Sequence, residues 1–302
     1  MLSLHSIATA GLLAAALASA QNSTECVKGL KVFVARGTNE TLNDAQSAFP
    51  NLGDLIGLGE TMGLGMTGTM LKPIFDQIDD SGYSSILYPA TDNDPVYFQS
   101  VANGTLLVRE AMTQYAKACP DSKMAWLGYS QGAQIISNNL CGMGAIWAYY
   151  AGDEATITEL LTPVPTEVSK NIVAVVLMGD PSYSNGTDYN HGTFNQTGSG
   201  VFYRHDFSAC NALGKRIRSY CDAGDPFCDV GDFFQTGIHT QYVQNHGEEI
   251  ISFVVEQFNN GGDSGGADPA PSDGERPVSG ASAVGAASSF AILASALFFS
   301  LS

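Results

Sequence analysis

The sequence predicts a three-layer α/β/α sandwich in which helices cover both faces of a central, mostly parallel sheet. Short apolar runs alternate with segments of helical period through residues 21–260, the order of elements that such folds show. Several runs are apolar throughout rather than alternating, which is typical of parallel strands buried on both faces. The stretch is about 240 residues long, a length that suits one domain with one sizeable core.

Five segments are predicted as strands. They are residues 30–35, 84–88, 123–129, 172–178 and 201–204. In a doubly wound sheet, ligands bind outside the carboxyl ends of the strands. Polar groups follow the first, third and fourth strands at that edge, and they are the segment 36–38, Ser130 and Asp180. These positions are therefore the first candidates for a functional site.

Two longer segments have the period of amphipathic helices. Residues 101–119 place apolar side chains near one face and polar ones on the other, so the Asn103 sequon points outward, as glycosylation requires. The apolar set is Val101, Val108, Ala111, Met112, Tyr115 and Ala118, and the polar set is Asn103, Glu110, Gln114 and Lys117. Residues 241–258 carry a core stripe of Ile250, Ile251, Val254 and Phe258.

The first 20 residues are interpreted as a secretory signal peptide. Residues 12–17 are apolar and Ala18-Ser19-Ala20 is an A-x-A cleavage pattern, although no Lys or Arg precedes them. Six cysteines and five Asn-x-Ser/Thr sequons also suit an oxidising secretory route. The sequons are at Asn22, Asn39, Asn103, Asn185 and Asn195. We therefore expect a secreted glycoprotein whose folded domain spans residues 21–260.

The C-terminal end has the pattern of a glycosylphosphatidylinositol (GPI) attachment segment. Residues 261–280 are rich in Gly, Ser, Pro and Asp and are expected to form a disordered linker. Ser279, Gly280 and Ala281 are small, and residues 290–301 are apolar. Residues 281–302 would be removed when the lipid is attached, which would leave the protein tethered to the cell surface or wall. A weak C-terminal membrane anchor, or a tail without a role, is the alternative.

The charge balance narrows the range of partners. The chain carries 13 basic and 30 acidic residues, with a formal net charge of -17 and a pI near 4.4. Such a surface argues against binding to nucleic acid or to an anionic membrane. Neither HExxH nor a C-x-x-C pair suggests a metal site. Residues 63–68 match G-x-G-x-x-G but follow no predicted strand, so we interpret them as a loop leading into a helix and expect no cofactor.

Residues 123–132, KMAWLGYSQG, carry the strongest chemical motif. An apolar run leads into Gly128-Tyr129-Ser130-Gln131-Gly132, and a segment able to form a helix follows. This is G-x-S-x-G in the strand–turn–helix context that exposes a nucleophilic serine. The two glycines would let the strand and helix backbones crowd against the strained turn. Ser130 is therefore a candidate nucleophile.

A nucleophilic serine needs a base, and in α/β hydrolases an acid and then a histidine follow the serine along the chain. Only His239 and His246 lie late enough to serve as that base. His239 falls in a predicted loop ahead of the last helix, whereas His246 falls inside that helix or at its start. A loop position swings more easily toward Ser130, so His239 is favoured.

Two aspartates are candidates for the acid that orients the base. Asp180 follows a predicted strand, and Asp225 lies in the segment CDAGDPFC. The residues alone leave the choice open, since a strand-end Asp before Pro is also an ordinary turn residue. A disulfide between Cys221 and Cys228 would hold Asp225 in a tight loop, which favours Asp225.

Taken in order, these motifs resemble the fungal cutinase and acetylxylan esterase family. GYSQG is followed by YCDAGDPFC and by a histidine fourteen residues beyond Asp225. ARGTNE at 35–40 is similar to the family's ARG-[ST]-x-E segment, and residues 84–90 resemble its strand ending in Tyr-Pro-Ala. The resemblance covers residues 26–258 and implies a small α/β hydrolase without a large lid. It further implies that the nucleophile, acid and base are Ser130, Asp225 and His239, and that the oxyanion hole is formed by Thr38 and Gln131.

The same resemblance implies the cysteine pairing, which the sequence alone leaves among fifteen possibilities. Cys26 is expected to pair with Cys119 and Cys221 with Cys228, which leaves Cys141 and Cys210 to pair by elimination. Two features depart from the family pattern or add to it. Thr38 stands where the family usually has Ser, and a glycan on Asn39 would stand beside the proposed site.

The resemblance therefore implies a monomeric serine esterase that hydrolyses carboxylic esters of plant cell-wall polymers. The wording YCDAGDPFC and the stretch at 192–193 are closer to acetylxylan esterases, which favours deacetylation of xylan or of short-chain esters. A cutinase that cleaves lipid polyester is the alternative, for which an apolar rim could come from Phe227, Phe233, Phe234 and Ile238. A second alternative is a GPI-linked wall protein that has lost catalysis and binds glycans, against which the intact set of candidate catalytic residues argues.

Overall fold

The computed structural model describes most of the region between residues 26 and 262. The described ranges are 26–40, 63–93, 95–144, 153–194, 198–231 and 237–262. The chain divides into two units, 1–265 and 266–302, and every described residue belongs to the first. The expected signal peptide and GPI segment lie outside the described residues, as do Asn22, Asn195, Phe233 and Phe234.

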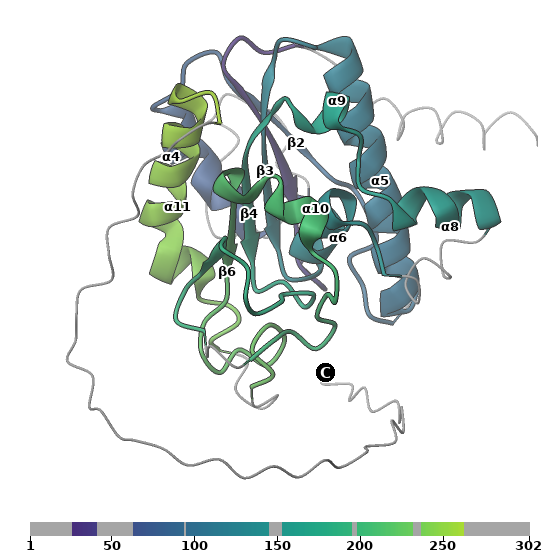
Figure 1. The fold of residues 1–302 in the computed structure, drawn as a ribbon. Helices are drawn as coiled ribbons and strands as arrows, with labels where there is room; N and C mark the ends of the chain where they lie inside the picture. Colours follow the sequence, from purple (N-terminus) through teal and green to yellow (C-terminus); the bar gives the residue numbers. More distant parts are fainter. Residues whose placement is uncertain are drawn as a thin grey trace, which may run out of the picture. The chain divides into compact units, whose positions relative to one another are not determined.

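A parallel sheet forms the centre of the first unit, and its described strands follow the order β2-β1-β3-β4-β6-β5 (Figure 1). Every neighbouring pair of strands runs parallel. β1 and β4 are buried at every residue, and β3 is buried at all but its first. This burial explains why these runs are apolar without alternation. The strands are β1 (Leu30–Ala35), β2 (Gly82–Ser85), β3 (Lys123–Tyr129), β4 (Ile172–Met178), β5 (Asn190–His191) and β6 (Ile217–Tyr220).

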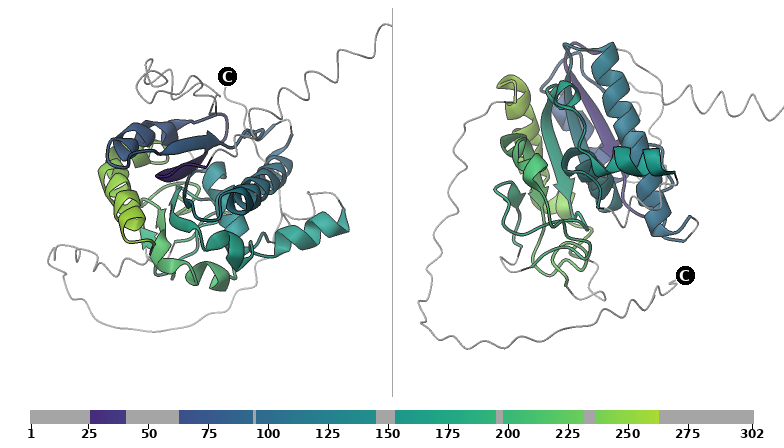
Figure 2. Two further views of the ribbon diagram at one scale, coloured as in Figure 1. Left: turned by 90° about the horizontal axis from the view of Figure 1, so that it is seen from above. Right: turned by 45° about the vertical axis from the view of Figure 1, so that its right-hand side comes forward.

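Helices cover both faces of the sheet and divide the core into two layers (Figures 1 and 2). Phe33 and Trp126 point into the layer beneath α5 and α6, where their rings stack with centroids 4.3 Å apart. Val32 and Leu127 point into the opposite layer, beneath η1, α4 and α11. Successive side chains of a strand point to opposite faces, so each strand supplies both layers. The predicted three-layer α/β/α sandwich is confirmed.

The elements that make up these layers have the following bounds. One face carries α5 (Tyr97–Ala118) and α6 (Gln131–Cys141), and the other carries η1 (Met66–Met70), α4 (Leu71–Phe75) and α11 (Tyr242–Asn259). Shorter helical segments in the connections are α8 (Glu154–Leu161), α9 (Thr166–Ser169), α10 (Ser208–Asn211) and η3 (Gly214–Arg216). Among the described residues, no helix combines the length and apolar character needed to span a bilayer.

The two predicted amphipathic helices form close to their predicted bounds. In α5, the expected core residues Val101, Val108, Met112 and Tyr115 are buried, and Asn103 is exposed as predicted. Ala111 is half-buried, and Ala118, the last residue of the helix, is exposed rather than part of the core stripe. In α11, Ile250 and Val254 are buried, whereas Ile251 and Phe258 are half-buried at the margin of the stripe. The loop predicted over the G-x-G-x-x-G match at 63–68 is shorter than expected, because η1 already begins at Met66. The helix expected after it is present as η1 and α4, over residues 66–75.

Two strand predictions need correction. β2 spans Gly82–Ser85 rather than 84–88, so it both begins and ends earlier than predicted. The carbonyl oxygens of Tyr88 and Pro89 accept bonds from the Arg36 guanidinium at 2.6 and 3.1 Å instead of bonds from a neighbouring strand. Residues 201–204 are not a strand. Their backbone N–H groups donate to loop carbonyls, with Val201 bonded to Phe227. The sheet instead continues through β6 and the two-residue β5.

Three disulfides fix the connections of the domain, and their pairing is the one expected. Cys26–Cys119 and Cys141–Cys210 close 93-residue and 69-residue separations, with Cα atoms 5.5 and 4.9 Å apart. Long closures of this kind restrict the unfolded chain most. Cys221–Cys228 spans only 7 residues and closes the loop that follows β6. Disulfides of this number are typical of proteins that fold in an oxidising compartment.

Candidate active site

Ser130 lies in the sharp turn between β3 and α6, at the carboxyl edge of the sheet. Its backbone angles, φ 52° and ψ -121°, lie in a region that residues with a side chain rarely adopt. A Cβ at Gly128 would stand 2.7 Å from the amide nitrogen of Ala133, and one at Gly132 would overlap the carbonyl oxygen of Ala35. The close approach of the backbones therefore requires both glycines, as the motif predicted. The turn aims the Ser130 side chain away from the sheet.

His239 stands between Ser130 and Asp225. Its Nε2 lies 2.9 Å from Ser130 Oγ, and its Nδ1 lies 2.7 Å from Asp225 Oδ2. The three side chains come from three places: the turn after β3, the loop after β6 and the turn before α11. All three are buried, with Asp225 completely so. An imidazole in this position can take a proton from the serine on one side while the carboxylate orients it from the other.

Asp225 is held on both of its oxygens. Oδ1 accepts the backbone N–H groups of Phe227 and Cys228 at 2.7 and 3.2 Å. Oδ2 accepts the Tyr242 hydroxyl at 2.6 Å in addition to its contact with His239. Burial alone would raise the pKa of Asp225, but the bonds from His239, Tyr242 and the backbone outweigh it and lower that pKa below its ordinary value. Asp225 is therefore an anion at neutral pH.

The loop that carries Asp225 is closed by its own backbone. The Asp225 carbonyl accepts the N–H groups of Asp229 and Gly231, each at 3.0 Å, and the Cys221–Cys228 disulfide ties the loop ends. Asp222, at the start of the loop, accepts from His246 Nε2 at 2.9 Å. Asp225 thus sits in a turn that backbone bonds and a disulfide close, as the sequence led us to expect.

The side chains of Thr38 and Gln131 meet close to Ser130, since Gln131 follows it in the chain and a Cβ at Gly37 would stand 3.2 Å from Ser130 Cβ. The side-chain Nε2 of Gln131 donates to Thr38 Oγ1 at 3.2 Å, and Gln131 Oε1 accepts from Ser100 Oγ at 2.7 Å. A hydroxyl oxygen that accepts this bond can still donate its own hydrogen. Gln131 is also the first residue of α6, whose backbone N–H has no partner within the helix. The two residues thus place a hydroxyl and a helix N-terminus beside the serine.

Glu40 anchors the segment that carries Thr38. Its Oε2 accepts the N–H of Gly37 at 2.6 Å, and its Oε1 accepts the N–H of Met66 at 2.8 Å. The sequence motif contained Glu40, but no role followed from the sequence. The structure shows that its carboxylate joins the loop after β1 to the start of η1.

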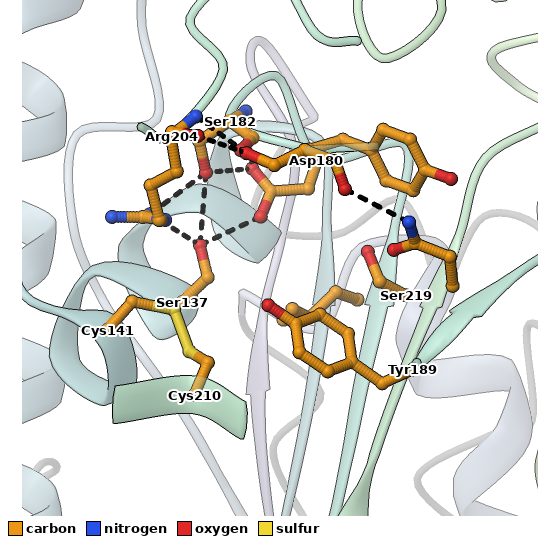
Figure 3. Close-up of a pocket in the computed structure, with 12 residues that line it drawn as sticks. Ser137, Cys141, Asp180, Ser182, Tyr189, Arg204, Cys210 and Ser219 are labelled. Atoms are coloured by element: carbon orange, nitrogen blue, oxygen red, sulfur yellow. Dashed lines mark hydrogen bonds between the residues drawn. A yellow bond between two sulfur atoms is a disulfide. The ribbon is translucent and has the colours of Figure 1, made fainter. Parts of the chain in front are cut away.

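The alternative candidates for acid and base lie elsewhere. Asp180 accepts bonds from Ser182 N and Oγ at 2.7 and 2.6 Å and from Ser137 Oγ at 2.8 Å. With Arg204 it lines a small internal pocket beside the Cys141–Cys210 disulfide (Figure 3). His246 lies within α11 and pairs with Asp222. The structure therefore brings together the favoured residues His239 and Asp225 and engages Asp180 and His246 in other contacts.

Aromatic rings enclose His239, and sequence reasoning missed most of them. The rings of Phe227 and Tyr129 lie 4.5 and 5.0 Å from the imidazole, centroid to centroid. Tyr242 reaches Asp225 with its hydroxyl, and only its position three residues after His239 could have suggested this. Of the predicted apolar rim, Phe227 and Ile238 are described, and both are half-buried. No group of three or more His, Cys, Asp or Glu suited to a metal ion occurs in the part of the chain that the structure describes.

Comparison with known proteins agrees with this geometry. The family model described as Cutinase matches residues 56–258. An acetylxylan esterase from Hypocrea jecorina is 32% identical over 227 residues, which are 72% of this chain and 70% of that protein. Cutinase 11 from Verticillium dahliae is 32% identical over 206 residues, 66% of this chain and 65% of that protein.

Solved structures show the same relationship. An acetylxylan esterase solved at 0.90 Å resolution superposes with a TM-score of 0.61 at 27% identity, covering 77% of this chain and 99% of that one. The catalytic core domain of an acetyl xylan esterase from Trichoderma reesei gives a TM-score of 0.59 at 28% identity, covering 77% of this chain and 100% of that one. The chain therefore belongs to the cutinase family and is a carboxylic ester hydrolase.

Proposed function

We propose that this protein is a secreted serine esterase in which Ser130 is the nucleophile, His239 the general base and Asp225 the acid that orients it. The observation that carries the proposal is the continuous line from Ser130 Oγ through His239 to Asp225, with contacts of 2.9 and 2.7 Å. Because the pKa of Asp225 is lowered, its carboxylate is charged and stabilises the imidazolium formed during the reaction.

The reaction follows from these positions. Ser130 Oγ attacks the ester carbonyl carbon while its proton passes to His239 Nε2, and the carbonyl oxygen becomes an oxyanion. The Gln131 backbone N–H, the Thr38 backbone N–H and the Thr38 hydroxyl donate to that oxyanion. When the tetrahedral intermediate collapses, the alcohol leaves with the proton from His239. Water, deprotonated by the same histidine, then hydrolyses the acyl-enzyme and restores Ser130. The mechanism needs no cofactor or metal.

For the substrate, we propose short-chain esters on plant cell-wall polymers, with acetylated xylan as the favoured case. Two relatives named acetylxylan esterase are 32% and 30% identical to this chain. A relative named cutinase is also 32% identical, and the apolar side chains of Phe227, which packs on His239, and of Ile238, its chain neighbour, make cleavage of lipid polyester the second candidate.

The acyl preference is measured with p-nitrophenyl esters of increasing chain length and with acetylated xylan. We expect kcat/KM to be highest for acetate and to fall as the chain lengthens, with acetate released from xylan. A maximum of kcat/KM at acyl chains of four or more carbons would contradict the acetyl preference and favour a cutinase. Ser130→Ala should abolish turnover of every ester. A variant that still hydrolyses esters at the parental rate would contradict the role of Ser130.

We further propose that the chain is an N-glycosylated monomer tethered to the cell surface by a GPI lipid. The exposed side chains of Asn39 and Asn103 support N-glycosylation at these two sequons. The side chain of Asn185, in a third sequon, is half-buried. Release of activity from cells by a phosphatidylinositol-specific phospholipase tests the lipid tether. A fall in mass after glycosidase treatment tests the glycans, and the elution volume in sizing chromatography tests the monomeric state. Activity that stays on the cells, an unchanged mass or a dimeric volume would contradict the corresponding part.

A further inference from the structure

Tyr242 is joined to the candidate acid by its hydroxyl group. It is the first residue of α11, three residues after His239, and it is completely buried. Its hydroxyl donates to Asp225 Oδ2 at 2.6 Å and accepts the backbone N–H of Asp222 at 3.0 Å. The Cys228 sulfur, at 3.2 Å, belongs to a disulfide and carries no hydrogen. The hydroxyl therefore lies among one donor and two acceptors.

The direction of the proton follows from these partners. An amide N–H can only donate, so the Asp222 amide occupies the Tyr242 oxygen as an acceptor. The Tyr242 hydrogen is then left for Asp225, whose carboxylate is a far stronger acceptor than a disulfide sulfur. Burial and the charge of Asp225 raise the pKa of Tyr242 well above its ordinary value, so the phenol keeps its hydrogen at every pH at which an esterase works.

Asp225 Oδ2 thus receives two donors, the Tyr242 hydroxyl and His239 Nδ1–H, while Oδ1 receives two backbone amides. Each donor stabilises the anion and reduces its basicity toward the others. We propose that Tyr242 is a positioning residue that sets both the place of Asp225 Oδ2 and the basicity of His239. This inference rests on the proposed serine esterase function.

Other ionisable groups near this network come from three elements. Tyr129 on β3 packs against His239, and His246 on α11 lies 6.1 Å from the Tyr242 ring. Asp222, in the loop after β6, pairs with His246. Burial would raise the pKa of Asp222, but His246, the Thr193 amide and Asn245 lower it to about 2. Asp222 therefore keeps its charge well above its own pKa, and it does not produce the effect tested below.

The test is Tyr242→Phe, which removes the hydroxyl and keeps the ring. Without this donor, the Asp225 carboxylate becomes more basic and stabilises the His239 imidazolium further, so the base becomes protonated at a higher pH. The midpoint of the acid limb of the kcat/KM profile should therefore move to higher pH, by roughly 0.5 to 1 pH unit. We expect kcat on its plateau to fall by about 3- to 10-fold, because the imidazole is held less firmly, with KM unchanged because Tyr242 is buried away from substrate.

A second variant and a control separate this role from a loss of stability. Replacing Tyr242 with a tyrosine fluorinated next to the hydroxyl makes the phenol a stronger donor, so the acid limb should move to lower pH. Tyr220→Phe is the matched control, because Tyr220 is equally buried but donates to Glu249 at 3.1 Å, and its acid limb should match the parent. If Tyr242→Phe does not fold, the direction in which the acid limb moves in the fluorinated protein tests the role of Tyr242 by itself.

The proton NMR signal of His239 Nδ1–H gives a readout that needs no turnover. We expect it to shift in Tyr242→Phe and to stay in place in Tyr220→Phe. A parental acid limb and an unmoved resonance in the Tyr242 variants would overturn the role of Tyr242 while leaving the esterase intact. A parent that hydrolyses no ester would instead overturn the proposed function, and the resonance would still report the hydrogen bond.

Discussion

Thr38→Val tests the oxyanion contact with the smallest change in shape. Valine replaces the hydroxyl by a methyl group of similar size, so the backbone of the segment 36–40 and its anchor at Glu40 should persist. The substitution removes the hydroxyl that accepts from Gln131 Nε2 at 3.2 Å and that we propose donates to the oxyanion. Gln131 Nε2 keeps its second acceptor, the carbonyl of Thr91 at 3.3 Å.

The size of the effect follows from the donors that remain. Loss of one side-chain donor to an oxyanion costs about 100- to 1000-fold in kcat, or about 3 to 4 kcal/mol of barrier. The backbone N–H groups of Thr38 and Gln131 stay, so we expect a loss near the lower end, about 100-fold. KM should change little, because the contact forms fully only when the charge develops.

The assay is steady-state hydrolysis of p-nitrophenyl acetate by the parent, Thr38→Val and Thr38→Ser. Serine keeps the hydroxyl and lacks only the methyl group, so it should stay within about 3-fold of the parent. A Thr38→Val enzyme with kcat within 3-fold of the parent would refute the proposed contact. A loss seen only in KM would mean that Thr38 contacts the bound substrate rather than the oxyanion.

Three further predictions concern the scaffold. Val230 is 58% exposed and has a positive φ of 50°, so Val230→Asn should relieve backbone strain and stabilise the protein by about 1 kcal/mol. Tm should rise by about 2–4 °C, and an unchanged Tm would argue against the strain. Gly132→Ala should lower the free energy of unfolding in urea by more than about 4 kcal/mol or prevent folding, because its Cβ would overlap the Ala35 carbonyl, and parental stability would contradict this close approach. The pKa of Asp222 is lowered from 3.8 to about 2, so its contribution to stability should be complete above about pH 5 and be lost as the pH falls through about 2. Asp222→Asn should flatten that part of the stability curve, and a curve as steep as that of the parent would contradict the assignment.

The turn that carries Ser130 could be predicted from the sequence because its requirements are local. A strand, two glycines and a serine within a few residues are enough to define the turn, and the structure has Ser130 at positive φ between close-packed backbones. The strands β1, β3 and β4 could be predicted for a similar reason. Each is a continuous apolar run of 6 or 7 residues, a length that favours a strand buried on both faces over a buried helix.

The choice between Asp180 and Asp225 could not be made from local sequence, because both precede proline after a strand. Contacts distant in sequence separate them. Asp180 is bonded to Ser137, 43 residues away, whereas Asp225 meets His239. The segment 201–204 failed as a strand for the same reason, since its backbone bonds go to loops remote in the chain. Tyr242 has the pattern of an ordinary core residue of a helix, and the partner of its hydroxyl appears only in three dimensions.

The central claim is that Ser130 is an activated nucleophile, and covalent trapping tests it most directly. The intact protein is treated with a fluorophosphonate and digested, and the modified peptide is located by mass spectrometry. We expect one phosphonyl group on Ser130 in the parent and none in Ser130→Ala. Folded parent protein that remains unlabelled, or that carries the group on another residue, would contradict the proposal.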